Sequence, residues 1–265
     1  MQVQDDNCHR MFKKTLKFND QLLNISYQSK ADLSVIEEFF IDKMYRSLDK
    51  IIPSLTYPIL DIGAHIGCFS LFANALNSKI KIIALEPEPN NFKLLKENLK
   101  VNHCKNVTAA QQAVIPNCHP EFISGSPGML KPVQHDNKTT ILYLNTDSHN
   151  HSTFYETENT LEVPATTLEN LISKSKLEKI SLLKMDIEGA EFEIFKNTCV
   201  ETWSKIQYIV VEYHELCTTR VQSKFNGNKK NDLENVIRSH GFSVEHFPNH
   251  YDKRFGLFIC RNKRI

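Results

Sequence analysis

The chain has 265 residues, of which 41% are hydrophobic and 24% are charged. This size favours one α/β domain with additions over two independent domains, and the composition excludes a chain that is mainly disordered. Lys and Arg number 32 against 31 for Asp and Glu, which leaves a net charge of +1. Because the chain has no basic excess to hold a polyanion, we do not expect a nucleic acid as its main partner.

The sequence carries no signal for a membrane or for export. No stretch approaches the ~18 consecutive apolar residues of a membrane span, and the polar N-terminal residues lack the apolar core of a secretory signal. We therefore expect no membrane span and a cytoplasmic location. The 7 cysteines are odd in number and form no C-x-x-C pair, so reduced thiols are expected.

The N-terminal part of the chain is predicted to be helical. Residues Ala31 to Leu48 carry apolar side chains at helical spacing, which indicates an amphipathic helix before the first strand. We therefore divide the chain into an N-terminal helical cap, residues 1–50, and one larger domain, residues 51–265.

Two strand-and-helix units open the larger domain. The apolar run Tyr57 to Leu60 predicts a strand, followed by the glycine turn DIGAHIG and a helix through Leu76. A second strand over Lys81 to Leu85 leads into a helix over Asn90 to Leu99. Alternating strands and helices of this length indicate parallel strands joined by right-handed crossovers, with helices on both faces of the sheet.

A third strand is predicted over Val107 to Val114, and the pattern then breaks. Residues 117–159 are rich in Gly, Pro, His and Asn, so we expect an irregular insertion that only the short apolar run Ile141 to Leu144 interrupts. Its inner part, Cys118 to Asp136, is either passenger sequence similar to translated palindromic repeats of bacterial genes or an ordinary lid or hairpin loop. The insertion also holds a polar cluster that either lines an acceptor pocket or is solvated: His149, Asn150, His151 and Ser152.

Regular structure resumes after the insertion. The expected strands are Leu161 to Pro164, Ile180 to Met185, Ile206 to Val211, Phe242 to Phe247 and Gly256 to Cys260. The expected helices are Leu168 to Lys174, Glu188 to Phe195 and Asp232 to His240. Together with the first half, these elements predict an α/β sheet that ends in a long hairpin.

The glycine turn after the first strand is a candidate ligand site, because open parallel sheets bind ligands beyond the carboxyl ends of their strands. The strand ends at Asp61, with Gly63 in the turn and Gly67 at the start of the helix. Gly63 permits a close approach of main chain to a ligand, and the free N–H groups of the helix start favour a carboxylate or phosphate. His65 replaces the middle glycine of the G-x-G-x-x-G fingerprint, which disfavours a nicotinamide dinucleotide.

A second acidic residue closes the next strand. Glu86 can accept both hydroxyl hydrogens of a ribose diol, and Asp61 is suited to an ammonium group. These three features match the groups of S-adenosylmethionine: Asp61 its amine, the helix start its carboxylate, and Glu86 its ribose. The alternative is that both carboxylates only cap the ends of their strands.

Four segments resemble successive motifs of the FkbM family of S-adenosylmethionine-dependent methyltransferases: DIGAHIGCFSL, ALEPEPNNFKLLKENLKVN, LLKMDIEGAEFEIF and IVVEYHE. The resemblance covers Pro58 to His214, and DIEGAE after an apolar strand is its most discriminating part. It implies a class I methyltransferase, Rossmann-like fold with a mostly parallel seven-stranded sheet and an antiparallel last strand. It also implies O-methylation of a hydroxyl on a small molecule or carbohydrate. The chain departs from the family at His65, where Asn is common, and in the insertion.

Carried over by position, the resemblance implies a set of residues that bind S-adenosylmethionine. These are Asp61, Gly63, His65 and Gly67 at the methionine end, Glu86 at the ribose, Gln112 and Ala113 at the adenine edge, and Asp186 beside the sulfonium.

Methyl transfer to an oxygen needs two aligned atoms and a base that removes a proton. The catalytic candidates at neighbouring strand ends are Asp186, Glu188, Glu191, Glu212 and His214. We rank His214 and Asp186 first, because an imidazole takes up protons near neutrality. Two of the others, Glu188 and Glu191, could instead be favoured in the first turn of a helix by its dipole.

Other interpretations of this strand-end cluster, and of the function of the whole chain, stay open. Glu212 and His214 could only pair with Lys184 or with each other, since residues two apart share one side of a strand. Several carboxylates and a His could bind Mg²⁺, but no ligand spacing indicates a metal site, so none is predicted. A catalytically inactive cofactor-binding module is the main rival to an active enzyme, and a nicotinamide-dependent oxidoreductase is less favoured.

Overall fold

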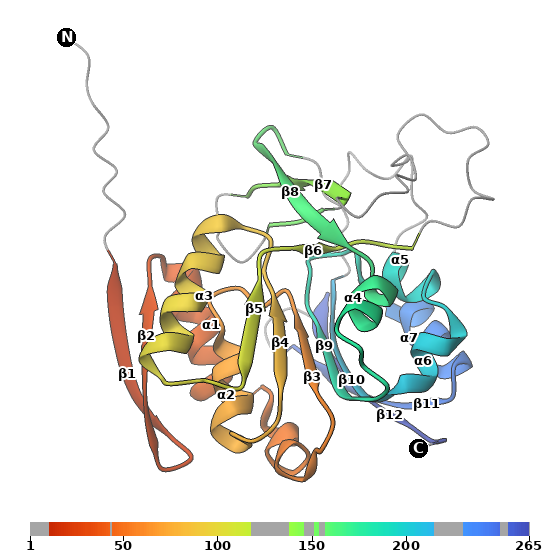
Figure 1. Cartoon of the computed structure of the whole chain (residues 1–265), viewed down its shortest axis with the longest axis horizontal. Coiled ribbons are helices and arrows are strands. Elements are labelled where there is room, and N and C mark those ends of the chain that lie inside the picture. The colour runs from red at the N-terminus through yellow and green to blue at the C-terminus, as the bar shows by residue number, and fades with distance from the viewer. Residues whose placement is uncertain are drawn as a thin grey trace.

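The computed structural model describes residues 11–42, 44–117, 138–145, 151–153, 157–214, 230–249 and 254–264. Within these residues, seven strands form a sheet in the order β11-β12-β10-β9-β3-β4-β5 (Figure 1). The strands are β3 (Ile59–Ile62), β4 (Ile82–Leu85), β5 (Val107–Ala110), β9 (Ile180–Met185), β10 (Ile206–His214), β11 (Phe242–Pro248) and β12 (Phe255–Asn262).

Across the sheet, the adjacent strands β5, β4, β3, β9 and β10 pair in parallel. β12 pairs antiparallel with both β10 and β11. The expected mostly parallel sheet with an antiparallel last strand is confirmed. The chain continues from β3 toward β4 and later returns to β9 on the other side of β3, so the winding direction reverses between β3 and β9. Ligands bind at such a reversal point.

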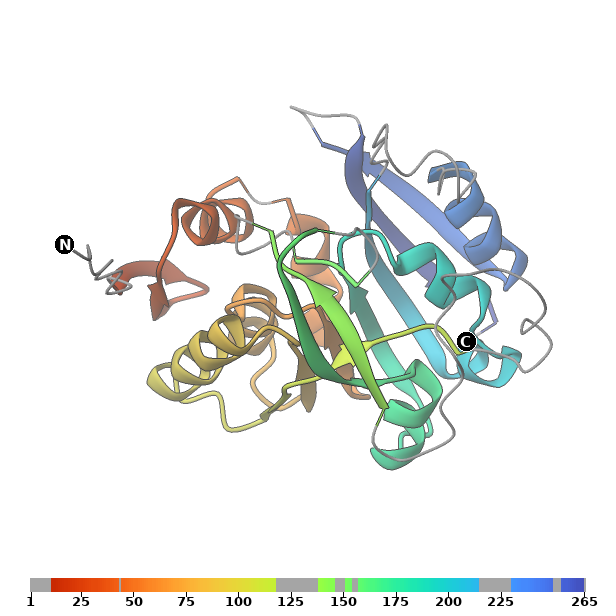
Figure 2. The same cartoon turned by 90° about the horizontal axis from the view of Figure 1, so that it is seen from above.

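Helices cover both faces of the sheet, as expected (Figure 2). On one face lie α1 (Lys30–Phe40), α2 (Cys68–Leu76) and α3 (Pro89–Val101), and on the other lie α4 (Leu168–Lys174), α5 (Glu191–Lys196), α6 (Val200–Lys205) and α7 (Lys230–Ser239). The strands next to the reversal point, β3 and β9, are buried along their length, because each of their faces packs against a helix layer. Their residues are apolar except for Asp61, Ser181 and Lys184.

The N-terminal segment differs from the expected helical cap. A hairpin of β1 (Phe12–Phe18) and β2 (Gln21–Tyr27) precedes α1, and α1 ends at Phe40 instead of continuing to Leu48. Two short 3₁₀ helices, η1 (Arg46–Lys50) and η2 (Ile52–Ser54), lead from it toward β3. The boundary at residue 50 stays a prediction.

The strand predicted over Val107 to Val114 is split in two. β5 belongs to the main sheet, but β6 (Ala113–Val114) joins β8 (Thr160–Thr166) and β7 (Lys138–Tyr143) in a separate small sheet. The insertion is therefore not irregular throughout, since β7 lies within it. Its inner part, Cys118 to Asp136, falls outside the described residues. No helix in the described ranges has both the length and the apolar character that crossing a membrane requires.

Candidate functional site

A cavity of about 390 Å³ opens at the carboxyl ends of the strands, beside the reversal point between β3 and β9. This volume lies within the range of small-molecule sites. Most of the residues expected to bind or act on ligands line it: Gly63, His65, Glu86, Gln112, Ala113, Asp186, Glu188, Glu212 and His214. Asp61 and Gly67 are not among the lining residues.

The glycine loop between β3 and α2 is shaped by contacts within the protein. Gly63 and Gly67 have φ angles of 74° and 93°, which strain any residue with a side chain. A Cβ on Gly63 would lie 1.8 Å from the main-chain oxygen of Asp186, and one on Gly67 would lie 2.7 Å from Leu95 Cδ1. Both glycines therefore permit close packing of the chain on itself. Gly67 does not line the cavity, and its expected contact with the ligand stays a prediction.

Asp61 is buried and does not line the cavity, so the structure gives no support to the expectation that its carboxylate faces a ligand ammonium. The residue is 0% exposed, and it accepts a hydrogen bond from Ser70 Oγ at 2.7 Å. Its other oxygen, Oδ1, lies 3.6 Å from Lys184 Nζ. Asp61 thus fixes the position of a buried lysine.

Lys184 links the glycine loop to the cavity. Its Nζ donates a hydrogen bond of 2.7 Å to the Gly63 carbonyl oxygen and lies 3.6 Å from Asp186 Oδ2. Burial by itself lowers the pKa of Lys184, but Asp186 and Asp61 outweigh it and the pKa is raised. The lysine is therefore charged, and it pairs with these two carboxylates instead of with Glu212.

His65 turns toward the N-terminal segment. It has a φ of 51°, and its Nε2 lies 3.2 Å from Asp32 Oδ1. The other oxygen of Asp32 accepts hydrogen bonds from the main-chain N–H groups of Gln28 and Ser29, as part of the capping box of α1. His65, which stands where the dinucleotide fingerprint has a glycine, thus connects the glycine loop to α1 through Asp32.

Glu86 has the geometry expected of a ribose-binding carboxylate. It lies directly after β4, lines the cavity, and is held by the main-chain N–H groups of Glu88 at 2.9 Å and His65 at 2.8 Å, one on each oxygen. Burial raises its pKa, although His65 and these hydrogen bonds lower it in part. Each carboxylate oxygen can accept a further hydrogen bond, which is what the two hydroxyls of a diol require.

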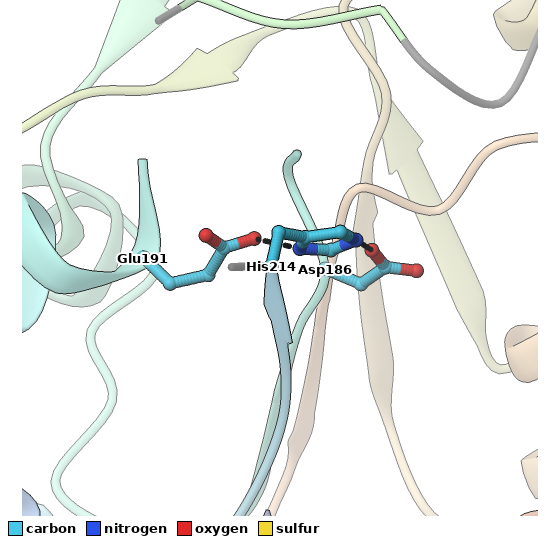
Figure 3. A group of neighbouring side chains, drawn as sticks. All are labelled: Asp186, Glu191 and His214. Atoms are coloured by element: carbon cyan, nitrogen blue, oxygen red, sulfur yellow. Dashed lines mark ion pairs between the residues drawn. The ribbon is translucent and has the colours of Figure 1, made fainter. Parts of the chain in front are cut away.

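His214 lies between two carboxylates, as Figure 3 shows. Its Nδ1 is 3.3 Å from Glu191 Oε1, and its Nε2 is 3.4 Å from Glu188 Oε2 and 3.9 Å from Asp186 Oδ1. Burial by itself lowers the pKa of His214, but Glu188, then Glu191 and Glu212, outweigh it and hold the pKa well above its usual range.

The imidazole of His214 is therefore protonated near neutral pH, and a ring with a proton on both nitrogens cannot accept another. This protonation state disfavours the expected role of His214 as a base, which stays a prediction. Its charge instead orients Asp186 and Glu188, so we treat it as a positioning residue.

The acidic residues that follow β9 have separate roles. Glu188 is not in a helix, because α5 begins at Glu191, and Glu188 has a left-handed φ of 59°. Burial, with Asp186 next, raises the pKa of Glu188 to about 8. The Glu191 carboxylate accepts hydrogen bonds from the main-chain N–H groups of Ile187 at 3.0 Å and Gly189 at 2.9 Å, which shapes the turn before α5.

One grouping could in principle hold a metal ion. Asp186, Glu191 and His214 each offer an atom, and these atoms lie within 4.8 Å of one another. The ion pairs of His214 already account for this grouping, and we assign no metal to it.

Sequence reasoning missed the part of the cavity wall that comes from the N-terminal segment. Val35, Glu38 and Phe39 of α1 and the following Tyr45 line the cavity. The spacing of the first three, i, i+3 and i+4, marks one face of a helix, and an acidic side chain on that otherwise apolar face was the available signal. From the insertion, His151 also lines the cavity, whereas His149 and Asn150 lie outside the described residues.

Comparisons with known proteins identify the family of the chain. The sequence profile described as the methyltransferase FkbM domain matches residues 61–244. The chain is 26% identical over 232 residues to the methyltransferase sdnD of Sordaria araneosa, covering 79% of this chain and 82% of that one. It is 24% identical over 208 residues to the 31-O-demethyl-FK506 methyltransferase FkbM of Streptomyces tacrolimicus, covering 70% and 72%.

Among solved structures, an rRNA methylase from Streptococcus thermophilus aligns with a TM-score of 0.47 and 9% identity, covering 84% of this chain and 98% of that one. The family match rests on the sequence profile, which spans the glycine loop, Glu86 and the strand-end cluster. The chain belongs to the FkbM family of S-adenosylmethionine-dependent methyltransferases.

Proposed function

We propose that the chain transfers the methyl group of S-adenosylmethionine to a hydroxyl oxygen of a small molecule or carbohydrate. The observation that carries the proposal is Asp186, a cavity-lining carboxylate at the reversal point that is flanked by two cations, Lys184 and His214. The name of the Streptomyces relative, a 31-O-demethyl-FK506 methyltransferase, supports transfer to oxygen.

The lining residues fit the cofactor. Glu86 would accept hydrogen bonds from the ribose hydroxyls, and Gln112 and Ala113 would lie along the adenine edge. When bound, S-adenosylmethionine supplies a methyl group on positively charged sulfur. The negative charge of Asp186 suits a place beside that sulfur, whereas Asp61 is excluded from any direct contact by its burial.

The proton of the acceptor hydroxyl needs a base inside the cavity. His214 is already protonated, and the raised pKa of about 8 makes Glu188 a poor base at neutral pH. Burial also raises the pKa of two other cavity carboxyls, that of Glu38 to about 7 and that of Glu212 well above its usual range. Asp186 differs from them in its pairs with Lys184 Nζ at 3.6 Å and His214 Nε2 at 3.9 Å, which fix the direction of its two oxygens. We infer that Asp186 accepts the proton, and that Lys184 and His214 position it.

The test is transfer of a labelled methyl group from S-adenosylmethionine to a panel of hydroxylated small molecules and carbohydrates. We expect Asp186→Asn to lower turnover by at least about 100-fold, the lower bound for loss of a general base, with little change in affinity for S-adenosylhomocysteine. Glu201→Gln is the matched control, because Glu201 pairs with Lys205 at 2.9 Å on the surface. Binding of S-adenosylhomocysteine without turnover of any hydroxyl would favour an inactive module, and full activity in Asp186→Asn would remove Asp186 as the base.

A further inference from the structure

The polar side chains of the cavity fall into two sets. Glu86, Lys184, Asp186, Glu188 and His214 all have hydrogen-bond or ion-pair partners in the protein. In contrast, Glu38, Tyr45 and Glu212 make no side-chain hydrogen bond or ion pair within the part of the chain that the structure describes. Polar groups left open in a cavity are positions where a ligand can make the missing contacts.

Among Glu38, Tyr45 and Glu212, which we call the open set, Tyr45 has the side chain whose position is most firmly fixed by packing. It is 1% exposed, its ring stacks on Phe39 at 4.2 Å between centroids, and Phe69 packs edge-on at 6.0 Å. Burial first, then the charges of Glu212, Asp186 and Glu38, raises its pKa well above the usual value, so the hydroxyl stays protonated among these carboxylates. A fixed ring with an unpartnered hydroxyl in the cavity is an observation independent of the acidic residues.

The open set also lacks a positive charge. The two cations of the cavity, Lys184 and His214, are engaged by Asp61, Asp186, Glu188 and Glu191. Glu38 and Glu212 have no cation of their own. Burial, with Asp186 next, raises the pKa of Glu38 to about 7 and that of Glu212 well above its usual range. A cation bound between them would lower both pKa values and favour the ionised carboxylates.

We infer that Glu38, Tyr45 and Glu212 form a subsite for a protonated amine of the methyl acceptor, so that the substrate class is a hydroxylated amine such as an amino sugar or amino alcohol. The inference rests on the proposed function and deepens it. An ammonium group brings three donors and one positive charge, which two carboxylates and a tyrosine oxygen can accept. A divalent ion fits less well, because a protonated tyrosine hydroxyl is not among its preferred ligands.

Two of the three residues precede the matched family region, which begins at residue 61. Glu38 comes from α1 and Tyr45 from the turn after it, and both reach the cavity because Asp32 and His65 join α1 to the glycine loop. The N-terminal segment therefore supplies acceptor specificity, whereas the shared family region supplies the cofactor site.

The experiment uses the full chain saturated with S-adenosylhomocysteine and two matched probes, trans-4-aminocyclohexanol and trans-1,4-cyclohexanediol. Calorimetry should give at least about tenfold tighter binding of the amine, since hydrogen bonds between charged groups are stronger than those of a neutral hydroxyl. Glu38→Gln should bring the two probes to within about twofold of each other, and Tyr45→Phe should weaken binding of the amine alone.

The control variant is Glu37→Gln, which changes the neighbouring residue of α1, because Glu37 accepts a hydrogen bond from Lys14 at 2.8 Å and does not line the cavity. It should keep the full preference for the amine. Equal affinity for the two probes, no binding of either, or an unchanged preference in Glu38→Gln would overturn the inference.

Two further readouts distinguish an acceptor amine from the amine of the cofactor and from a metal ion. If Glu38→Gln weakens binding of S-adenosylhomocysteine itself, the subsite holds the amine of the cofactor and the inference is overturned. If Mn²⁺ binds the wild type by electron paramagnetic resonance and Glu38→Gln removes it, the cation is a metal, which also overturns it. Absence of S-adenosylhomocysteine binding in the wild type would instead contradict the proposed function.

Discussion

The protonation states of the ionisable residues in the cavity depend on their neighbours in the fold. The sequence places His214 and Asp186 at neighbouring strand ends, and both do line one cavity. Their identity was predictable from the motifs, but their protonation was not. The ion pairs of His214 with Glu188 and Glu191 depend on the turn that follows β9, and no periodic pattern in the sequence encodes that turn.

The same cluster predicts how stability depends on pH. The pKa values of Glu38 and Glu188 are raised from 4.5 to about 7 and about 8, so the folded chain binds more protons than the unfolded chain between these values. The raised pKa of His214 acts in the same direction, because its contribution is complete below the unfolded imidazole pKa and is lost as pH rises through the folded one.

We therefore predict that the free energy of unfolding in urea falls as pH rises from about 5 to about 8. Glu188→Gln should make this fall shallower, because it removes one of the titrating groups, whereas the surface variant Glu201→Gln should leave the slope as it is. A stability that rises with pH over this interval would contradict the assignment of the raised pKa values.

At the level of elements, α3 holds the N-terminal hairpin against the glycine loop through one buried side chain. Asn98 is 0% exposed, and its Oδ1 accepts from Ser26 N at 2.7 Å. Its Nδ2 donates to the carbonyl oxygens of Ser26 at 3.0 Å and Ile66 at 2.9 Å. One residue of α3 thus joins β2 to the loop that precedes α2.

We predict that Asn98→Ala lowers the free energy of unfolding by about 2–4 kcal/mol, since it leaves buried main-chain groups without partners. The matched variant is Asn102→Ala, one turn further along α3, where the side chain bonds to the main chain of Asn24 at an exposed position. This variant should cost less than about 1 kcal/mol. Equal losses in urea unfolding would show that Asn98 does not anchor the hairpin.

Elements with a mostly apolar run or with apolar residues at helical spacing were predictable, and those without either pattern were not. The strand over Ile180 to Met185 and the helix over Leu168 to Lys174 have the predicted bounds. The hairpin of β1 and β2 was missed because only one side of it packs on the protein and its other side chains are polar or exposed. The helix after β9 starts later than predicted because Glu188 and Gly189 have left-handed φ angles.

At the scale of the whole molecule, segments far apart in the sequence meet at one edge of the sheet. The fold class and the position of the cavity followed from strand order, since parallel strands place all their carboxyl ends together. The contribution of α1 did not follow, because the packing of a helix that precedes the first parallel strand is not set by that rule. The cavity is complete only when the N-terminal segment, the glycine loop and the ends of β9 and β10 are in contact.

The central claim is that this cavity binds S-adenosylmethionine with Glu86 at the ribose. Calorimetry with S-adenosylhomocysteine tests it on the wild type, Glu86→Gln and the control Glu201→Gln, whose residue pairs with Lys205 at 2.9 Å on the surface and does not line the cavity. We predict tight binding by the wild type and the control, and a loss of about 1–3 kcal/mol in Glu86→Gln. Wild-type affinity in Glu86→Gln, or binding of NADH with none of S-adenosylhomocysteine, would contradict the claim.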